Sequence, residues 1–182
     1  SRVNAEKLIL EVGVNVNEKL IYKPGKKFKS DSKIKLVQVN DDWLSLHAFK
    51  LIAAFDKWKL VAENKICLDA FCGLGSVSQV LINKNCTKVF LHDTDSKELD
   101  SVLNNDKVFN HTGYTLRELT EKEISEKIDF CFINASEHAL NKTLPFVQSF
   151  LNKDSDVVCV IRPKLEVEKE HLKNNGEVRN TL

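Results

Sequence analysis

The stretch Leu68-Asp69-Ala70-Phe71-Cys72-Gly73-Leu74-Gly75 lies between two apolar segments of different periodicity. Residues 66–70 have the length and composition of a buried strand, and residues 77–82 have the apolar spacing of a helix. Glycines in the turn between them let the backbone approach a ligand closely, and the start of a helix offers free N–H groups. The stretch therefore predicts a strand–turn–helix unit that binds a small molecule at its turn.

The spacing in this turn is Asp-x-x-x-Gly-x-Gly, which differs from the G-x-G-x-x-G pattern of dinucleotide sites. We interpret it as a site for S-adenosylmethionine (SAM), in which Asp69 receives the ammonium group and Gly73 and Gly75 lie close to the ligand. Asp93 follows the next predicted strand, about 20 residues after the glycines, where a carboxylate can accept both ribose hydroxyls of a nucleoside. The two motifs leave NAD and SAM open, and the glycine pattern favours SAM.

Predicted strands and helices alternate over most of the chain. Strands are expected at 66–70, 88–92, 108–109, 128–133 and 157–161, and helices at 43–58, 77–82, 98–103 and 140–151, followed by a charged loop or tail at 165–182. Such alternation is typical of an α/β fold with a doubly wound parallel sheet, which binds ligands at the carboxyl ends of its strands. We therefore predict a Rossmann-like fold of the class I SAM-methyltransferase type.

Residues 1–40 have a different composition and are expected to form a small separate module, with residues 41–182 as the α/β domain. A helix is expected at 4–11, a strand at 14–17, a turn at 23–26, and a second strand containing Ile34, Leu36 and Val39. This segment contains nine Lys or Arg residues and four acidic residues, which gives it a net charge of +5, whereas residues 41–182 have a net charge of −4. This asymmetry indicates a surface that binds a polyanion, although a solvated basic face would have the same composition. The candidate RNA-binding residues are Arg2, Lys19, Lys23, Lys26, Lys27 and Lys29.

The composition narrows the class of protein further. The chain has 182 residues, 42% hydrophobic and 29% charged, as is usual for a folded globular protein. No apolar run approaches the roughly 20 residues that span a bilayer. Five scattered cysteines without a CxxC pair are expected to be buried, reduced thiols, and no cluster has the spacing of a metal site. We expect a cytoplasmic protein without a metal or a membrane partner.

Several segments share, in order, the pattern of one family: residues 13–17 with 23–25, 44–51, 69–75 with Asp93, 162–166, and 175–179. In these segments the chain resembles the TlyA-type rRNA methyltransferases, often labelled hemolysin A, which are relatives of the FtsJ-type 2′-O-methyltransferases. The resemblance implies that residues 1–40 are part of an alpha-L RNA-binding module. It also implies SAM as the cofactor and ribosomal RNA or a ribosomal subunit as the partner. From the resemblance we expect this chain to lack the first helix of that module and the last strands of the sheet.

The resemblance also implies a catalytic tetrad of Lys, Asp, Lys and Glu, which the FtsJ-like relatives use to deprotonate a ribose 2′-hydroxyl. Lys50 matches the first lysine, Asn134 stands at the Asp position, Arg162 stands at the second Lys position, and the fourth position falls beyond Leu182. An asparagine carries no charge, and an arginine with a pKa above about 12 is no general base near neutral pH. Lys50 is thus the matched candidate for the base, and slow or absent methyl transfer is expected.

Two functions follow from these observations. The first is SAM-dependent 2′-O-methylation of rRNA. The alternative is a catalytically degenerate RNA-binding protein of the same fold without turnover, which the altered tetrad supports. Asn134 is also compatible with amino-methyltransferases that carry Asn-Pro-Pro-aromatic at this strand end, but residues 135–137 here are Ala-Ser-Glu.

Overall fold

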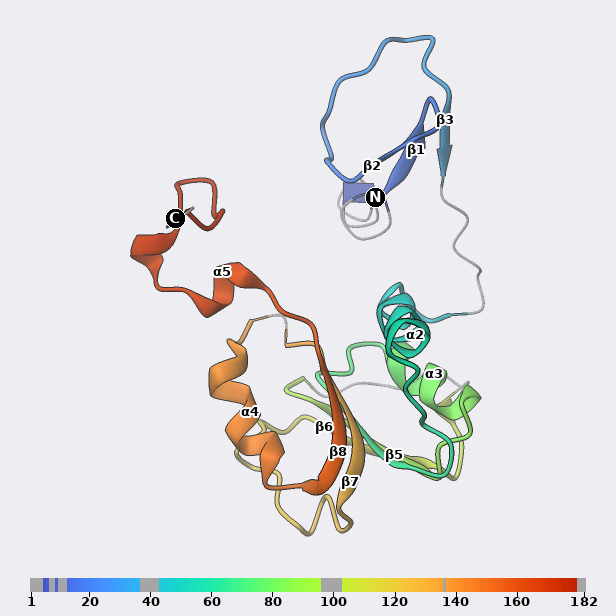
Figure 1. The fold of residues 1–182 in the computed structure, drawn as a ribbon, viewed down its shortest axis with the longest axis vertical. Helices are drawn as coiled ribbons and strands as arrows, with labels where there is room; N and C mark the ends of the chain where they lie inside the picture. The colour runs from blue at the N-terminus through green and yellow to red at the C-terminus, as the bar shows by residue number, and fades with distance from the viewer. Residues whose placement is uncertain are drawn as a thin grey trace. The chain divides into compact units, whose positions relative to one another are not determined.

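The structure is a computed structural model that describes residues 5–6, 9, 13–36, 43–95, 103–135 and 137–179. The chain divides into two compact units, Ser1–Leu46 and His47–Leu182, each of which is drawn in Figure 1. The expected boundary between residues 40 and 41 lies outside the described residues.

The first unit contains a small antiparallel sheet in which β1 (Val14–Val16) pairs with both β2 (Lys19–Ile21) and β3 (Ile34–Leu36). Asn17 and Glu18 join β1 to β2 with φ angles of 50° and 66°, the combination that a type I′ hairpin turn requires. The strands expected near 14–17 and at Ile34 are confirmed, whereas β2 was not predicted because its short sequence has no alternating pattern. The expected helix at 4–11 lies largely outside the described residues, as do Val39 and Arg2.

The second unit alternates helices and strands, as its sequence predicts. In chain order it contains α2 (His47–Trp58), β4 (Ile66–Ala70), α3 (Ser76–Asn83), β5 (Lys88–Asp93), β6 (Val108–Thr112), β7 (Ile128–Ile133), α4 (Leu140–Gln148), β8 (Leu151–Cys159) and α5 (Pro163–Glu166), then a short 3-10 helix (Lys169–His171). The helix expected at 98–103 lies almost wholly outside the described residues. The expected tail contains the 3-10 helix, one bridge between Leu172 and Val178, and the last two residues of α5.

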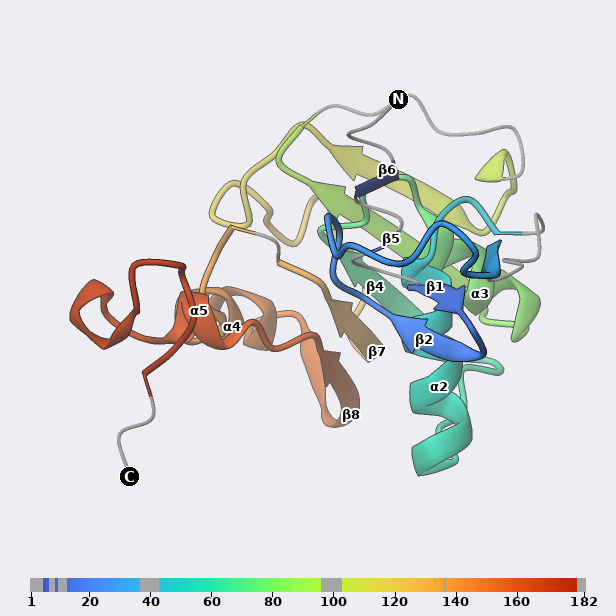
Figure 2. The same cartoon turned by 90° about the horizontal axis from the view of Figure 1, so that it is seen from above.

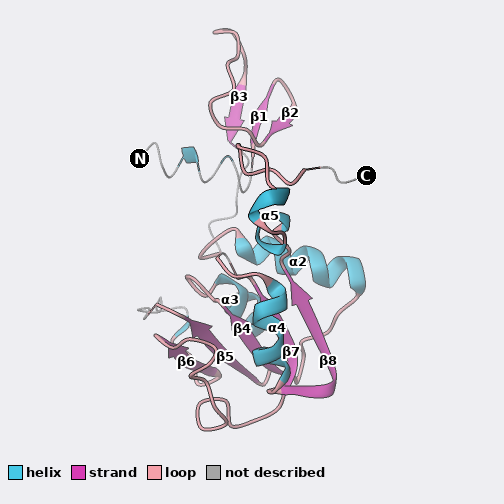
Figure 3. Ribbon diagram, turned by 90° about the vertical axis from the view of Figure 1, so that its left-hand side faces the viewer, coloured by secondary structure: helices cyan, strands magenta, loops and turns pink. Residues whose placement is uncertain are grey.

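The five strands of this unit form one parallel sheet in the order β6-β5-β4-β7-β8, which confirms the predicted fold (Figure 2). The chain winds outward from β4 in both directions, first to β5 and β6 and then to β7 and β8. The order therefore reverses at the carboxyl end of β4, the switch point at which such sheets bind ligands. After β8 the chain continues into α5 (Figure 3).

Both faces of the sheet are covered, α2 and α3 lying on one and α4 on the other (Figure 1). On the α2 face, the Phe55 ring stacks on Phe130 of β7, with ring centroids 5.4 Å apart. On the α4 face, the neighbouring β7 residues Cys131 and Ile133 are fully buried in a cluster with Val147. This alternation of buried side chains along β7 is typical of a strand that is covered on both sides.

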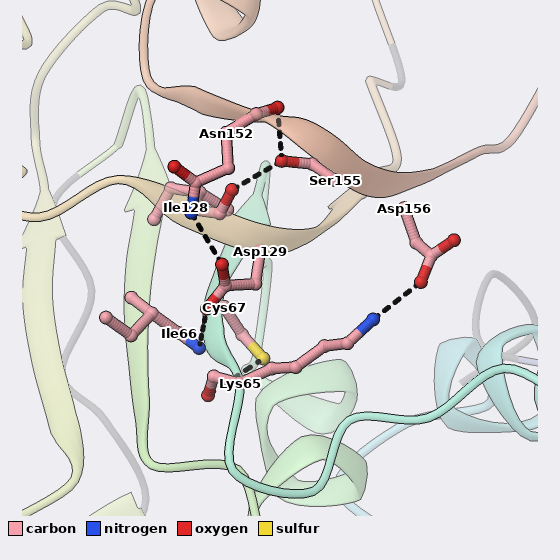
Figure 4. Close-up of polar contacts among 8 residues, drawn as sticks. All are labelled: Lys65, Ile66, Cys67, Ile128, Asp129, Asn152, Ser155 and Asp156. Carbon is pink, nitrogen blue, oxygen red and sulfur yellow. Dashed lines mark hydrogen bonds and ion pairs between the residues drawn. The ribbon is translucent and has the colours of Figure 1, made fainter.

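The last strand differs from the predicted one, because β8 begins at Leu151 rather than at Val157. Its first part pairs with Ile128, and the register then shifts so that Asp156 faces Phe130. The Ser155 hydroxyl stabilises this irregular segment by donating to the carbonyl of Ile128, 2.6 Å away (Figure 4). A bulge of this kind interrupts the apolar alternation, so the sequence pattern indicates only the second half of the strand.

None of the helices that the structure describes combines the length and the apolar character that crossing a membrane requires. All five cysteines are free thiols, and four of them are buried.

Candidate functional site

The loop after β4 forms the centre of the candidate site. Gly73 and Gly75 have φ angles of 58° and 79°, in the left-handed region that favours glycine. A Cβ atom at Gly75 would also collide with the buried side chain of Leu103. Gly75 then caps the start of α3, so the two glycines set the path of the chain from β4 into this helix.

Asp93 links this loop to the end of β5. Its Oδ2 accepts a hydrogen bond of 2.9 Å from the Gly73 N–H, and its Oδ1 accepts one of 3.2 Å from the Asp95 N–H. A carboxylate oxygen can accept more than one hydrogen bond. Asp93 can therefore hold the glycine loop and still accept from the hydroxyls of a ligand.

Asp69 lies within the sheet and is 1% exposed. Its Oδ2 accepts from the Ser78 N–H at 3.0 Å and the Ser78 hydroxyl at 2.7 Å, whereas its buried Oδ1 has no hydrogen-bond partner among the described residues. Burial raises the pKa of Asp69 to about 7, the hydrogen bonds from Ser78 oppose the rise, and the nearby Asp93 adds to it. An unsatisfied buried oxygen of this kind fits a ligand that brings a positively charged donor.

A cavity of about 370 Å³ lies between α4 and the loops that follow β4, β5, β6 and β7. Thr94, the residue after Asp93, forms part of its wall. Apolar, hydroxyl-bearing and cationic side chains complete the lining: Phe71, Thr115, Leu116, Arg117, His138, Lys142, Thr143 and Phe146. The mixture of an apolar surface with a few polar groups is typical of a site for a small organic ligand.

A second cluster lies where β7 and β8 end. Asn134 is 5% exposed, and its Oδ1 accepts a 2.8 Å hydrogen bond from Arg162, which also donates to the carbonyl of Ala135 at 2.7 Å. The Asn134 Nδ2 lies 2.8 Å from Nδ1 of His47, the first residue of α2. The structure thus brings Asn134 and Arg162 together.

This cluster fixes the proton on His47. A guanidinium can only donate, so Arg162 orients the Asn134 carboxamide with its oxygen toward the guanidinium and its NH2 toward His47. Nδ1 of His47 must then accept, which assigns the ring proton to Nε2. Sequence reasoning did not single out His47 as a site residue, because a lone histidine near a helix start has no specific signature.

Lys50 lies on α2 three residues after His47 and is exposed. Residues separated by three positions are neighbours on a helix surface, so α2 carries both side chains on one side.

The lysines proposed for RNA binding are exposed in the first unit: Lys19 on β2, and Lys23, Lys26, Lys27 and Lys29 in the segment between β2 and β3. Within the described part of the chain, no His, Cys, Asp or Glu side chains group in a way that could hold a metal ion.

Comparison with known proteins identifies the family of the chain. Residues 43–182 match the model of the FtsJ-like methyltransferases. The chain belongs to the FtsJ-like methyltransferase family. This result confirms the resemblance that the sequence segments indicate.

The chain has curated relatives at modest identity. It is 27% identical over its whole length to Hemolysin A of Brachyspira hyodysenteriae, of which it covers 76%. Over 76% of its length it is also 27% identical to the 16S/23S rRNA (cytidine-2′-O)-methyltransferase TlyA of Mycobacterium tuberculosis, of which it covers only 52%. A solved structure named as a hemolysin, from Streptococcus thermophilus, shares the fold with a TM-score of 0.75 at 24% identity, over 98% of this chain and 66% of that one.

Proposed function

We propose that this chain transfers a methyl group from SAM to a ribose 2′-hydroxyl of ribosomal RNA. The observation that carries the proposal is the match to the FtsJ-like family together with a cavity at the carboxyl edge of the sheet, which Thr94, the residue after Asp93, helps to line. The printed activity of the relative TlyA supports rRNA as the substrate and a ribose oxygen as the acceptor. We expect such a protein to act in the cytoplasm.

The proposed cofactor site uses the residues at the ends of β4 and β5. Asp93 would accept from the ribose hydroxyls, Oδ1 of Asp69 would accept from the ammonium group, and Gly73 and Gly75 would let the backbone lie close to the ligand. The cavity beyond Thr94 would take the base. When bound, SAM would supply an electrophilic methyl group.

The proposed acceptor site uses residues at the ends of β7 and β8 and on α2. Lys50 would take the proton from the 2′-hydroxyl, Arg162 would hold an RNA phosphate, and Asn134 would keep Arg162 and His47 in place. Because no carboxylate stands at position 134, catalysis would come mainly from positioning of the hydroxyl in line with the methyl group. The lysines of the first unit would add sequence-independent affinity for RNA.

Calorimetry tests the cofactor assignment. The chain should bind SAM and its demethylated product, S-adenosylhomocysteine, and its affinity for NAD should be lower than its affinity for either. Asp93→Ala should weaken binding about ten-fold or more, because a charged hydrogen-bond acceptor is lost. Asp106→Ala is the matched control, since Asp106 is an exposed carboxylate just before β6, at the opposite end of the strands. Unchanged affinity in Asp93→Ala would exclude the proposed site.

Digestion of methylated rRNA to nucleosides tests the acceptor. The proposal predicts a 2′-O-methyl nucleoside. A base-methylated nucleoside would instead support an amino- or carbon-directed activity of the same fold.

A further inference from the structure

Phe71 has an unusual backbone conformation for its residue type. Its φ angle is 64°, in the left-handed region, and the other non-glycine residues with positive φ in the described part of the chain are asparagines, a glutamate and a lysine. A bulky side chain is disfavoured in this region because its Cβ crowds the following carbonyl oxygen. Phe71 directly follows β4, in the same turn as Gly73 and Gly75, where a glycine would adopt the conformation without strain.

The Phe71 ring connects the core to the cavity. It packs edge-on against the buried His92 of β5, with centroids 5.2 Å apart, and lies 5.7 Å from the ring of His138. His92 is itself held, because its Nε2 lies 2.8 Å from the carbonyl oxygen of Tyr114. Beyond these contacts the Phe71 side chain is half-buried and lines the 370 Å³ cavity beside Thr94 and Phe146.

This placement gives the ring a ligand to contact. In the proposed function, Asp93 holds the ribose, and the next residue, Thr94, already lines the cavity. The base attached to that ribose would therefore enter the space that Phe71 borders. A flat heteroaromatic base gains binding energy when it stacks on an aromatic side chain.

We propose that Phe71 is a specificity-determining residue of the cofactor site, whose ring forms the wall on which the nucleoside base stacks. The inference rests on the proposed function. The ring lines the cavity, and its contacts with His92 and His138 hold its orientation. The competing possibility is that the ring only packs against the apolar core, with which it is also in contact.

Two substitutions separate the effect of the Phe71 ring from the effect of the backbone strain at this position. Phe71→Ala removes the ring and keeps a Cβ at positive φ, whereas Phe71→Gly removes the ring and relieves the strain. Phe71→Gly should therefore unfold at a higher urea concentration than Phe71→Ala, and it provides a folded variant if Phe71→Ala is unstable. Equal midpoints would contradict the strained backbone on which the proposal depends.

Affinity for S-adenosylhomocysteine and for methylthioadenosine, which lacks the amino-acid end, gives the decisive readout. Both ligands should bind about ten-fold more weakly to both variants, and the upfield shift of the adenine protons in the bound state should be lost. Phe109→Ala, which removes a partly exposed phenyl ring from β6, should bind as the wild type does. Unchanged or tighter binding by Phe71→Gly would overturn the inference. Unchanged binding would mean that the ring only packs against the core, and tighter binding would mean that it obstructs the ligand. A wild-type chain that binds neither ligand would overturn the cofactor assignment itself, and this inference with it.

Discussion

At the scale of single residues, Asp69 couples the stability of the fold to pH. Its pKa is about 7 in the folded chain, above the ordinary value of 3.8. Between these two values the folded state binds more protons than the unfolded state, so this residue makes the fold less stable as pH rises from about 4 to 7. The cause is the buried and only partly hydrogen-bonded carboxylate.

Asp69→Asn should remove this dependence, because a carboxamide keeps an acceptor for Ser78 and does not ionise. The free energy of unfolding of the variant, relative to wild type, should increase by roughly 2 kcal/mol between pH 5 and pH 8. Urea unfolding at several pH values measures it. A difference between the two proteins that stays constant with pH would show that Asp69 does not titrate in this range.

Asn134 offers a second test at this scale, because both the oxygen and the NH2 of its carboxamide have hydrogen-bond partners. An aspartate at position 134 could still accept from Arg162, but it would place an oxygen beside Nδ1 of His47. Asn134→Asp should therefore lead His47 to bind a proton at Nδ1 and remain charged to higher pH than in the wild type. A pH titration of the imidazole by NMR measures the change. An identical titration in the two proteins would contradict the hydrogen-bond assignment.

At the scale of elements, the turn from β4 into α3 shows why glycine is needed at two positions for different reasons. A Cβ at Gly73 would meet open space, so Gly73→Ala adds only the cost of a positive φ, about 1 kcal/mol. Gly75→Ala adds the same cost and a collision with buried Leu103, and should lose roughly 3 kcal/mol or more. Chemical denaturation of the two variants compares them, and equal losses would refute the close packing at Gly75.

The elements that the sequence predicts are those whose environment is uniform. β4, β5 and β7 are apolar runs buried on both faces, and α3 has regular helical spacing, so their positions follow from the pattern. The sequence predicts too short a strand for β8, because a hydrogen bond from the Ser155 hydroxyl stabilises a bulge that interrupts the apolar pattern. The helix α2 begins four residues later than its apolar pattern does. The roles of His47 and Phe71 depend on partners distant in sequence, such as Asn134 and His138, which no local pattern could indicate.

At the scale of the whole molecule, the charge asymmetry predicts that the first unit binds RNA. If the basic first unit binds RNA, replacing Lys26 and Lys27 together by alanine should weaken the affinity for structured rRNA. It should also flatten the slope of log affinity against log salt by about one to two, because fewer counterions are released. A double replacement of Lys122 and Lys153, two exposed lysines of the second unit, is the control for net charge. An unchanged slope in the first variant would mean that this face only solubilises the protein.

The chain spans 52% of the length of the relative TlyA, and two of its matched tetrad positions carry Asn134 and Arg162 in place of Asp and Lys. Residues that act as one catalytic unit do not contribute additively, so the departures at Asn134 and Arg162 should slow the reaction strongly. Slow transfer that still depends on Lys50 separates an enzyme from a binding protein of the same fold.

The most direct measurement is transfer of a radiolabelled methyl group from SAM to deproteinised rRNA and to whole ribosomal subunits. We predict slow incorporation that falls to background in Lys50→Ala and is unchanged in Lys57→Ala, which removes another exposed lysine from the same helix. Incorporation that survives Lys50→Ala would contradict the proposed base. A wild-type chain that binds SAM and RNA but incorporates no label would contradict the proposed activity and favour a binding protein without turnover.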